Sequence, residues 1–310
     1  MNYALELKEV SKTYDNSDFV LDKVSFSLPQ GAVMGFVGEN GAGKTTTIGC
    51  ILNTLFRDSG EIRLFGKEMN DDDIELREDI GVVYDGDNFP SYLTAGQLSN
   101  IMQGIYSKWD NALFQKYLNT FHLSKGQKIG KYSKGMTMKL AIAVALAHHP
   151  KLLILDEATS GLDPVMRDEM LDVFLDFVSS EEHSILLSSH ITTDLEKVAD
   201  YITFIHNGKI ILTERKDNLI YNYAILRCKE KQFAELDTKD IFAYRRQDYQ
   251  IDVLVTNKKL AERKYSGMVV DHAKIDEIML ILDERRPAMR GLLRNNLYGV
   301  IENIKIVFAL

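Results

Sequence analysis

Hydrophobic residues follow two different patterns in the first two thirds of the chain. Tyr3, Leu5 and Leu7 alternate with polar residues, and a second alternating run follows at 24–28. Alternation with a period of two is typical of strands with one buried face, so these segments predict an antiparallel pair. The run 152–155 is apolar throughout, which is typical of a parallel strand buried on both faces. Further strands are predicted at 33–37, 61–65, 80–84, 184–187, 201–206 and 209–213.

Helical patterns replace strand patterns in the middle of the chain. Thr94 and Gln97 have the spacing of a capping box and predict a helix over 95–106. Asp110 is suited to cap a second helix, and the Ala-rich stretch 137–147 predicts a third. The pattern therefore predicts a helical insertion between two strands of the core.

The last third of the chain has a different character. Short strands are predicted there among helical stretches, at 224–228, 250–255 and 268–270. With a helix at 275–282, they predict a small α/β accessory domain over 216–288. The final segment, 289–310, starts basic and amphipathic and becomes apolar. It resembles the opening of an ABC-2-type permease, which predicts a membrane-seeking tail, and a C-terminal docking helix is the alternative.

Composition excludes several classes of protein. The net charge of −8 argues against a general nucleic-acid-binding protein, which would carry a basic surplus. No apolar run reaches the roughly 20 residues that span a bilayer, and charged residues interrupt 1–10, unlike a signal peptide. We therefore expect a cytoplasmic protein. Cys50 and Cys228 lack metal-site or C-x-x-C spacing and are expected to be reduced, partly buried thiols.

A phosphate-binding loop is predicted between the strand 33–37 and a following helix. Its sequence, Gly-Glu-Asn-Gly-Ala-Gly-Lys-Thr, matches G-x-x-x-x-G-K-[ST]. Its glycines allow successive N–H groups to converge on one anion beside the helix N-terminus. Lys44 is expected to reach the outer phosphates and the Thr45 hydroxyl to bind Mg²⁺. The predicted site comprises Gly38, Glu39, Asn40, Gly41, Ala42, Gly43, Lys44, Thr45 and Thr46.

Two carboxylates, Asp156 and Glu157, follow the predicted strand 152–155. In open α/β sheets the chemistry lies at the carboxyl ends of strands, and a P-loop enzyme needs an acid there to hold its metal. We therefore predict Asp156 as a Mg²⁺ partner and Glu157 as the base for water, with a helix cap as the structural alternative. His190 follows the strand 184–187 and is predicted to contact the γ-phosphate.

Three further segments have both a structural and a functional interpretation. Tyr14 lies in a polar turn, where its ring is able either to stack on a planar base or to pack under a loop. Ser133 and Gly135 precede the predicted helix 137–147 and offer a second anion site. The acidic run 71–73 fits a metal site, but a helix N-terminus also favours adjacent carboxylates, and we predict a cap.

Several motifs stand in the order and approximate spacing of one family: Gly38–Thr45, Ser133–Gly135, Leu152–Glu157, Ser160–Asp163 and His190. Over Met1 to about Arg215, the chain resembles the ATP-binding subunits of ABC transporters. The resemblance implies an α/β P-loop NTPase fold with a RecA-like core, an antiparallel β-subdomain and a helical subdomain over about 89–150. It also implies an ATP-binding domain over 1–215 that forms a head-to-tail homodimer or heterodimer around two ATP molecules.

The resemblance further implies a role for each motif residue. Lys44 would bind the β- and γ-phosphates, and Thr45 with Asp156 would hold Mg²⁺. Glu157 would polarise the attacking water, and His190 would sense the γ-phosphate. The remaining contacts would come from Tyr14 on the adenine, Asp163 across the dimer interface, and Ser133 with Gly135 on the ATP of the opposite subunit.

Two positions depart from the family pattern. The signature, usually Leu-Ser-Gly-Gly-Gln, is Tyr-Ser-Lys-Gly-Met at 132–136, which adds a charge and loses an amide. The strand 80–84 leads in the family to a Gln that contacts Mg²⁺ and couples the site to the membrane partner, and Asp85 stands there. A carboxylate also binds a hard metal but adds negative charge near the phosphates. We therefore predict Asp85 as a metal ligand with altered coupling and retained hydrolysis.

These features predict an ATP-hydrolysing subunit that drives transport through a separate permease. The expected partners are an ABC-2-type permease and a second ATP-binding subunit. The resemblance points to exporters linked to antimicrobial-peptide export or resistance, attached to the inner face of the cell membrane through the permease. Two alternatives remain. The first is a soluble ABC ATPase that acts in translation or DNA repair, although such proteins usually carry two cassettes or a long coiled coil. A nucleotide-gated regulatory module would bind ATP and hydrolyse little.

Overall fold

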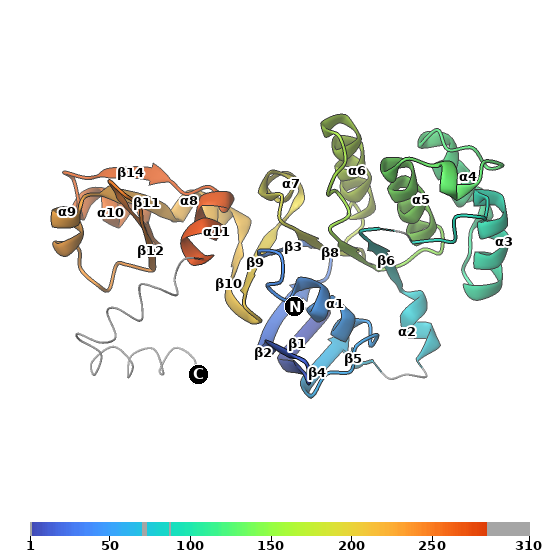
Figure 1. Cartoon of the computed structure of the whole chain (residues 1–310), viewed down its shortest axis with the longest axis horizontal. Helices are drawn as coiled ribbons and strands as arrows, with labels where there is room; N and C mark the ends of the chain where they lie inside the picture. Colours follow the sequence, from blue (N-terminus) through green and yellow to red (C-terminus); the bar gives the residue numbers. More distant parts are fainter. Residues whose placement is uncertain (1, 70–72, 87, 284–310) are drawn as a thin grey trace. The chain divides into compact units, whose positions relative to one another are not determined.

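The computed structural model describes residues 2–69, 73–86 and 88–283 (Figure 1). Two compact units divide the chain, Met1–Arg215 and Lys216–Leu310, here called unit 1 and unit 2. The predicted tail 289–310 lies outside the described residues. Among the residues that are described, no helix is both long and apolar enough to cross a membrane.

An antiparallel sheet begins unit 1, with the strand order β2-β1-β4-β5. Its strands are β1 (Tyr3–Tyr14), β2 (Ser17–Pro29), β4 (Ser59–Leu64) and β5 (Lys67–Glu68). The predicted pairing of the first two strands is confirmed, because Leu5 lies opposite Leu28 and Leu7 opposite Phe26. These four side chains are buried, as the period-two alternation requires.

The central sheet of unit 1 has the order β10-β9-β3-β8-β7-β6. Its strands are β3 (Val33–Val37), β6 (Ile80–Tyr84), β7 (Leu152–Asp156), β8 (Ser184–Ser189), β9 (Tyr201–His206) and β10 (Lys209–Arg215). The five strands from β9 to β6 are parallel, whereas β9 and β10 form an antiparallel hairpin. Asn207 and Gly208 in its turn have φ of 48° and 74°, as a type I′ turn requires. All residues of β7 are buried, which confirms the prediction for this strand.

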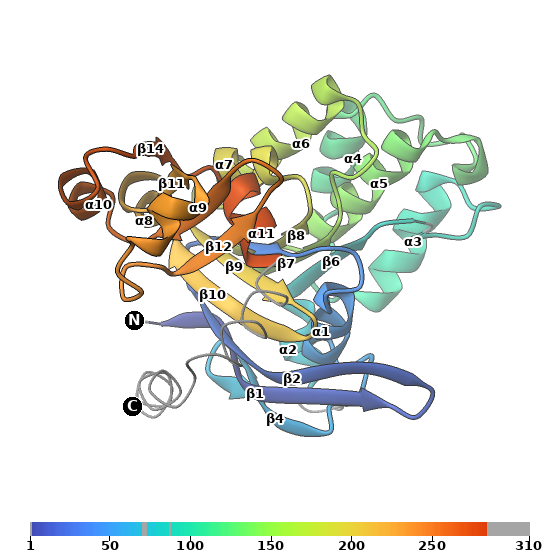
Figure 2. The same ribbon diagram turned by 60° about the vertical axis from the view of Figure 1, so that its left-hand side comes forward.

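Seven α-helices are described in unit 1: α1 (Lys44–Ile51), α2 (Ile74–Glu78), α3 (Ala95–Ile105), α4 (Asn111–Thr120), α5 (Lys134–Leu146), α6 (Pro164–Phe177) and α7 (Thr192–Val198). A short 3₁₀ helix, Ile129–Lys131, precedes α5. In Figures 1 and 2, α3, α4 and α5 group together on one side of the unit, and β1, β2 and β4 lie on another, with the central sheet between them. The helical insertion therefore lies beside β6, apart from the antiparallel sheet.

Side-chain caps fix the starts of five of these helices, α2 to α6. Thr94 and Gln97 form the predicted capping box, and Asp110 accepts the N–H of Leu113 at 2.9 Å. Asp73 caps α2, which confirms the cap interpretation for this residue, while 71 and 72 lie outside the described residues. The predicted start of the third helix at 137 was wrong. Ser133 accepts the N–H of Met136 at 3.2 Å, and this cap begins α5 one turn earlier.

Unit 2 has its own sheet, in the order β12-β13-β11-β14. Its strands are β11 (Ala224–Cys228), β12 (Ala243–Arg246), β13 (Ile251–Val255) and β14 (Val269–His272). Its helices are α8 (Lys216–Asn222), α9 (Glu230–Ala234), α10 (Lys258–Lys264) and α11 (Ile275–Asp283). Leu226, Val253 and Val255 belong to a buried apolar cluster formed within this unit. Cys228 here and Cys50 in unit 1 are buried thiols without a disulfide, and burial raises the pKa of both.

Candidate nucleotide site

The predicted phosphate loop connects β3 to α1 (Figure 1). Gly41 and Gly43 have φ of 82° and 114°, a region that residues with a Cβ rarely adopt. Gly38 has a different requirement, since a Cβ there would lie 2.4 Å from the carbonyl oxygen of Ile205. Gly43 is also the residue that precedes α1, so the N-terminal N–H groups of this helix begin at the loop. The glycine spacing in the sequence thus matches the backbone geometry that an anion site needs.

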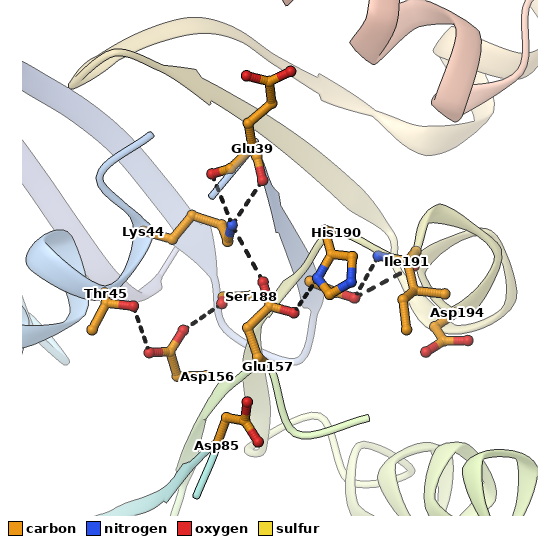
Figure 3. A network of polar contacts seen from close by, with 12 residues as sticks. Glu39, Lys44, Thr45, Asp85, Asp156, Glu157, Ser188, His190, Ile191 and Asp194 are labelled. Atoms are coloured by element: carbon orange, nitrogen blue, oxygen red, sulfur yellow. Dashed lines mark hydrogen bonds and ion pairs between the residues drawn. The ribbon is translucent and has the colours of Figure 1, made fainter. Parts of the chain in front are cut away.

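Lys44 points back into its own loop and is 5 % exposed. Its ammonium donates to the carbonyl oxygens of Gly38 at 2.7 Å and Glu39 at 3.2 Å. The same Nζ lies 3.2 Å from Oε1 of Glu157, which approaches from the end of β7 (Figure 3). The loop therefore holds a buried cation at its centre, directly beside one of the two predicted catalytic carboxylates.

Asp156 closes the site from the last position of β7. Its Oδ2 accepts a hydrogen bond from the Thr45 hydroxyl at 2.9 Å, and its Oδ1 accepts one from the Ser188 hydroxyl at 2.6 Å. Asp156 and Ser188 are register partners of the parallel pair β7–β8, which explains why they meet. Ser188 was not predicted as a site residue. Its signal is its place at the carboxyl end of a strand that neighbours Asp156.

Glu157 and His190 form a second pair at the same edge of the sheet. Nδ1 of His190 lies 2.6 Å from Oε2 of Glu157 (Figure 3). Glu157 has a positive φ of 53°, unusual for a residue with a long side chain, and its N–H donates to the carbonyl oxygen of Ser188. Backbone and imidazole together therefore fix the direction of this carboxylate, and Lys44 approaches its other oxygen.

An open pocket of about 310 Å³ lies over the phosphate loop. It is lined by Phe19, Asn40, Gly41, Gly43, Lys44, Thr45, Thr46 and Glu157. Phe19, from β2, was not predicted, and it is the aromatic side chain in this lining. Tyr14, predicted to stack on adenine, lies at the end of β1, where the Lys12 ammonium is 5.6 Å from its ring centroid.

The other predicted residues lie on neighbouring segments. Ser133 caps α5, and Gly135 packs closely in its first turn, where a Cβ would lie 2.0 Å from the Met166 sulfur. Asp163 caps α6 by accepting the N–H groups of Val165 at 3.1 Å and Met166 at 3.0 Å. Both helices thus begin with a side-chain cap and pack against each other at their first turns.

Asp85 follows β6 and pairs with Lys134, whose Nζ lies 2.8 Å from its Oδ1. Of the other predicted metal ligands, the Thr45 hydroxyl donates a hydrogen bond to Asp156. The two positions that depart from the family pattern, Asp85 and the lysine of the signature, are therefore in direct contact.

A phosphate loop, a buried lysine and two carboxylates at the carboxyl edge of a parallel sheet define a P-loop ATPase site. Comparison with known proteins supports this assignment. The family model described as ABC transporter matches residues 21–160. The bacitracin transport ATP-binding protein BcrA of Bacillus licheniformis is 35 % identical over 216 residues, which are 68 % of this chain and 69 % of the relative.

Two further similarities extend this result. The lantibiotic transport ATP-binding protein SrtF of Streptococcus pyogenes is 33 % identical over 69 % of this chain and 91 % of its own length. A solved structure, described as the ATP-binding subunit of an ABC transporter, has a TM-score of 0.62 at 27 % identity, over 70 % of this chain and 91 % of that one.

The chain belongs to the ABC transporter family. It is an ATP-binding and ATP-hydrolysing subunit, of the kind that drives transport through a separate permease. The predicted fold class is confirmed by the structural similarity and by the sheets described above.

Proposed function

We propose that unit 1 hydrolyses ATP with the residues gathered at the carboxyl edge of its central sheet. The observation that supports this most directly is the linked set Lys44, Glu157 and His190, whose polar atoms follow one another at 3.2 and 2.6 Å. In this proposal Lys44 binds the β- and γ-phosphates and Glu157 orients the attacking water. His190 holds the Glu157 carboxylate in position and senses the γ-phosphate.

Thr45 and Asp156 fit Mg²⁺, which prefers hard oxygen ligands and binds through few protein groups. The hydroxyl and the carboxylate are adjacent, and Asp156 is 5 % exposed, with Ser188 and Thr45 as its hydrogen-bond donors. Bound there, the ion would neutralise charge on the phosphates. We assign Asp85 no direct place in this ligand set, because its carboxylate is paired with Lys134.

We further propose that two ATP-binding subunits form a head-to-tail dimer, as a homodimer or with an unlike subunit. Each ATP would lie between the phosphate loop of one subunit and Ser133 with Gly135 of the other, with Asp163 at the interface. Tyr14 and Phe19 are the aromatic residues proposed to contact the adenine. This arrangement agrees with the capped helix starts that present Ser133 and Asp163.

We propose export of a peptide antibiotic through an ABC-2-type permease, with the chain on the inner face of the cell membrane. Support comes from the relatives, one named for bacitracin transport and one for lantibiotic transport. In this proposal 1–215 is the ATP-binding domain, 89–150 its helical subdomain and 216–288 an accessory domain.

The test is the ATPase rate of the purified chain beside its Glu157→Gln variant, with oligomeric state followed in the same samples. We expect the variant to lose about 100-fold or more in rate, as removal of a general base does, and to accumulate as an ATP-dependent dimer. Glu182→Gln, an exposed change in a loop, is the matched control and should keep the wild-type rate. ATP binding with negligible wild-type hydrolysis would favour the regulatory alternative.

A further inference from the structure

Lys134 connects two segments that meet at the ATP site. It is the first residue of α5, and its ammonium lies 2.8 Å from Asp85, the residue that follows β6. It also runs over Gly161, in the turn between β7 and α6. A Cβ at Gly161 would lie 3.0 Å from Nζ and 3.5 Å from Cε of the lysine. Any residue larger than glycine at 161 would therefore crowd the Lys134 side chain.

The surroundings of the pair show why the contact matters for charge. Asp85 follows β6 at the edge of the sheet where Asp156 and Glu157 follow β7, so it is a third carboxylate there (Figure 3). An unpaired carboxylate would repel both the other two and the phosphates. Lys134 neutralises this carboxylate, and Lys44 pairs with Glu157, so each cation has its own acid.

Because the Lys134–Asp85 pair is exposed, we infer a role in positioning and not in folding stability. The side chains are 50 % and 42 % exposed, and exposed ion pairs contribute little to folding stability. Such a pair nonetheless joins two backbone segments, here the end of a core strand and the N-terminus of a helix.

We propose that Lys134 and Asp85 form an electrostatic link that positions the Ser133–Gly135 helix start relative to the ATP site of the same subunit. The link rests on the proposed function, because its effect is on ATP-dependent dimerisation and hydrolysis. Both residues are positioning residues. Closure of the dimer places Ser133 and Gly135 on the partner's ATP, and the link sets the angle at which they arrive.

The test is a double-mutant cycle on the full chain. Asp85→Asn and Lys134→Met should each lower kcat or raise the ATP concentration for half-maximal dimerisation by about threefold, which is within the range of exposed ion pairs. The double neutral variant should be no worse than either single change. The charge reversal Asp85→Lys should cost about tenfold through lysine–lysine repulsion, and adding Lys134→Asp should restore most of it.

Two controls complete the experiment. Lys131→Met removes an exposed lysine nearby and should leave both readouts unchanged. Raising the salt concentration should shift both readouts of the wild type towards those of the double neutral variant, because salt screens exposed pairs. Additive effects in the cycle, or a charge swap that restores nothing, would overturn the link while the Glu157→Gln comparison still supports hydrolysis. A wild-type chain that neither hydrolyses ATP nor dimerises would overturn the proposed function, and the link with it.

Discussion

Ser188 illustrates how a single hydroxyl supports the chemistry of this site. It is fully buried at the end of β8 and donates to Oδ1 of Asp156 at 2.6 Å, while Thr45 donates to Oδ2 at 2.9 Å. A carboxylate held by two donors has a fixed orientation, and its remaining lone pairs point in a defined direction. The hydroxyl of Ser188 therefore orients the proposed metal ligand from behind, as outer-shell partners of metal sites do.

Ser188→Ala should raise the Mg²⁺ concentration needed for half-maximal ATP hydrolysis by about tenfold, in the range typical of lost outer-shell partners. It should also lower the free energy of unfolding by about 1–3 kcal/mol, because a buried carboxylate oxygen loses its donor. Titration of ATPase activity with Mg²⁺ and denaturant unfolding measure the two effects. Ser189→Ala is the matched control, since that hydroxyl bonds the local backbone of Ile191. An equal Mg²⁺ requirement in both variants would contradict the orienting role.

Residues that belong to a recognisable motif were predictable, even where they reach the site from distant segments, as Asp156, Glu157 and His190 do. Residues outside these motifs were not. The motif that contains Lys44 and Thr45 occupies eight consecutive residues. Ser188 and Phe19 reach the site only because β8 pairs with β7 and β2 lies over the phosphate loop. The Lys134–Asp85 contact has the same origin. Both residues were noticed as departures from a family pattern, but the pattern carries no information on their separation.

Helix α5 shows the same distinction for an element. Its apolar interior was evident, but its predicted start was wrong by one turn because the cap Ser133 is followed by Lys-Gly-Met, a sequence without helical periodicity. Its other end is fixed by a buried residue, His148, which stacks on Tyr106 with ring centroids 4.0 Å apart. Nδ1 of His148 faces the carbonyl oxygen of Val144, and Nε2 faces that of Ile80 at the start of β6.

This position makes the attachment of α5 to β6 sensitive to acid. Burial lowers the pKa of His148, and the two facing carbonyl groups, both of which only a protonated ring is able to bond, oppose this only in part. The unfolded chain takes up a proton below about pH 6.5, where the folded chain still holds the ring neutral. The contribution of His148 is therefore fully present above that pH and is lost as the pH falls towards the folded pKa.

The measurement is the free energy of unfolding between pH 8 and pH 5, by denaturant titration. His148→Gln should be less stable than the wild type at pH 8 because it loses the stack on Tyr106, but its stability should fall less on acidification. His122→Gln changes an exposed histidine in the turn after α4 and should keep the wild-type slope. If all three proteins showed the same slope, His148 would not be the residue that titrates.

For the molecule as a whole, each unit has its own sheet and buried cluster. In unit 2 the cluster is joined to a charged network centred on Arg227 of β11. Its guanidinium forms ion pairs with Asp252 at 2.8 Å, with Asp271 at 3.1 Å and with Glu277, which lie on β13, β14 and α11. One side chain therefore holds together three elements of this unit, and its contacts lie inside the unit.

Arg227→Met should accordingly destabilise unit 2 and spare unit 1. Asp252 has a side chain only 4 % exposed, and removing its cation leaves a buried charge with amide donors alone, at a cost of about 3 kcal/mol. Denaturant unfolding of the full chain should show two transitions, with the lower one shifted in the variant and ATP binding lost only in the upper one. Arg263→Met, an exposed change on α10, should shift neither. A single transition that moves as a whole would mean that the two units unfold together, because the loss of one network would then be felt by the entire chain.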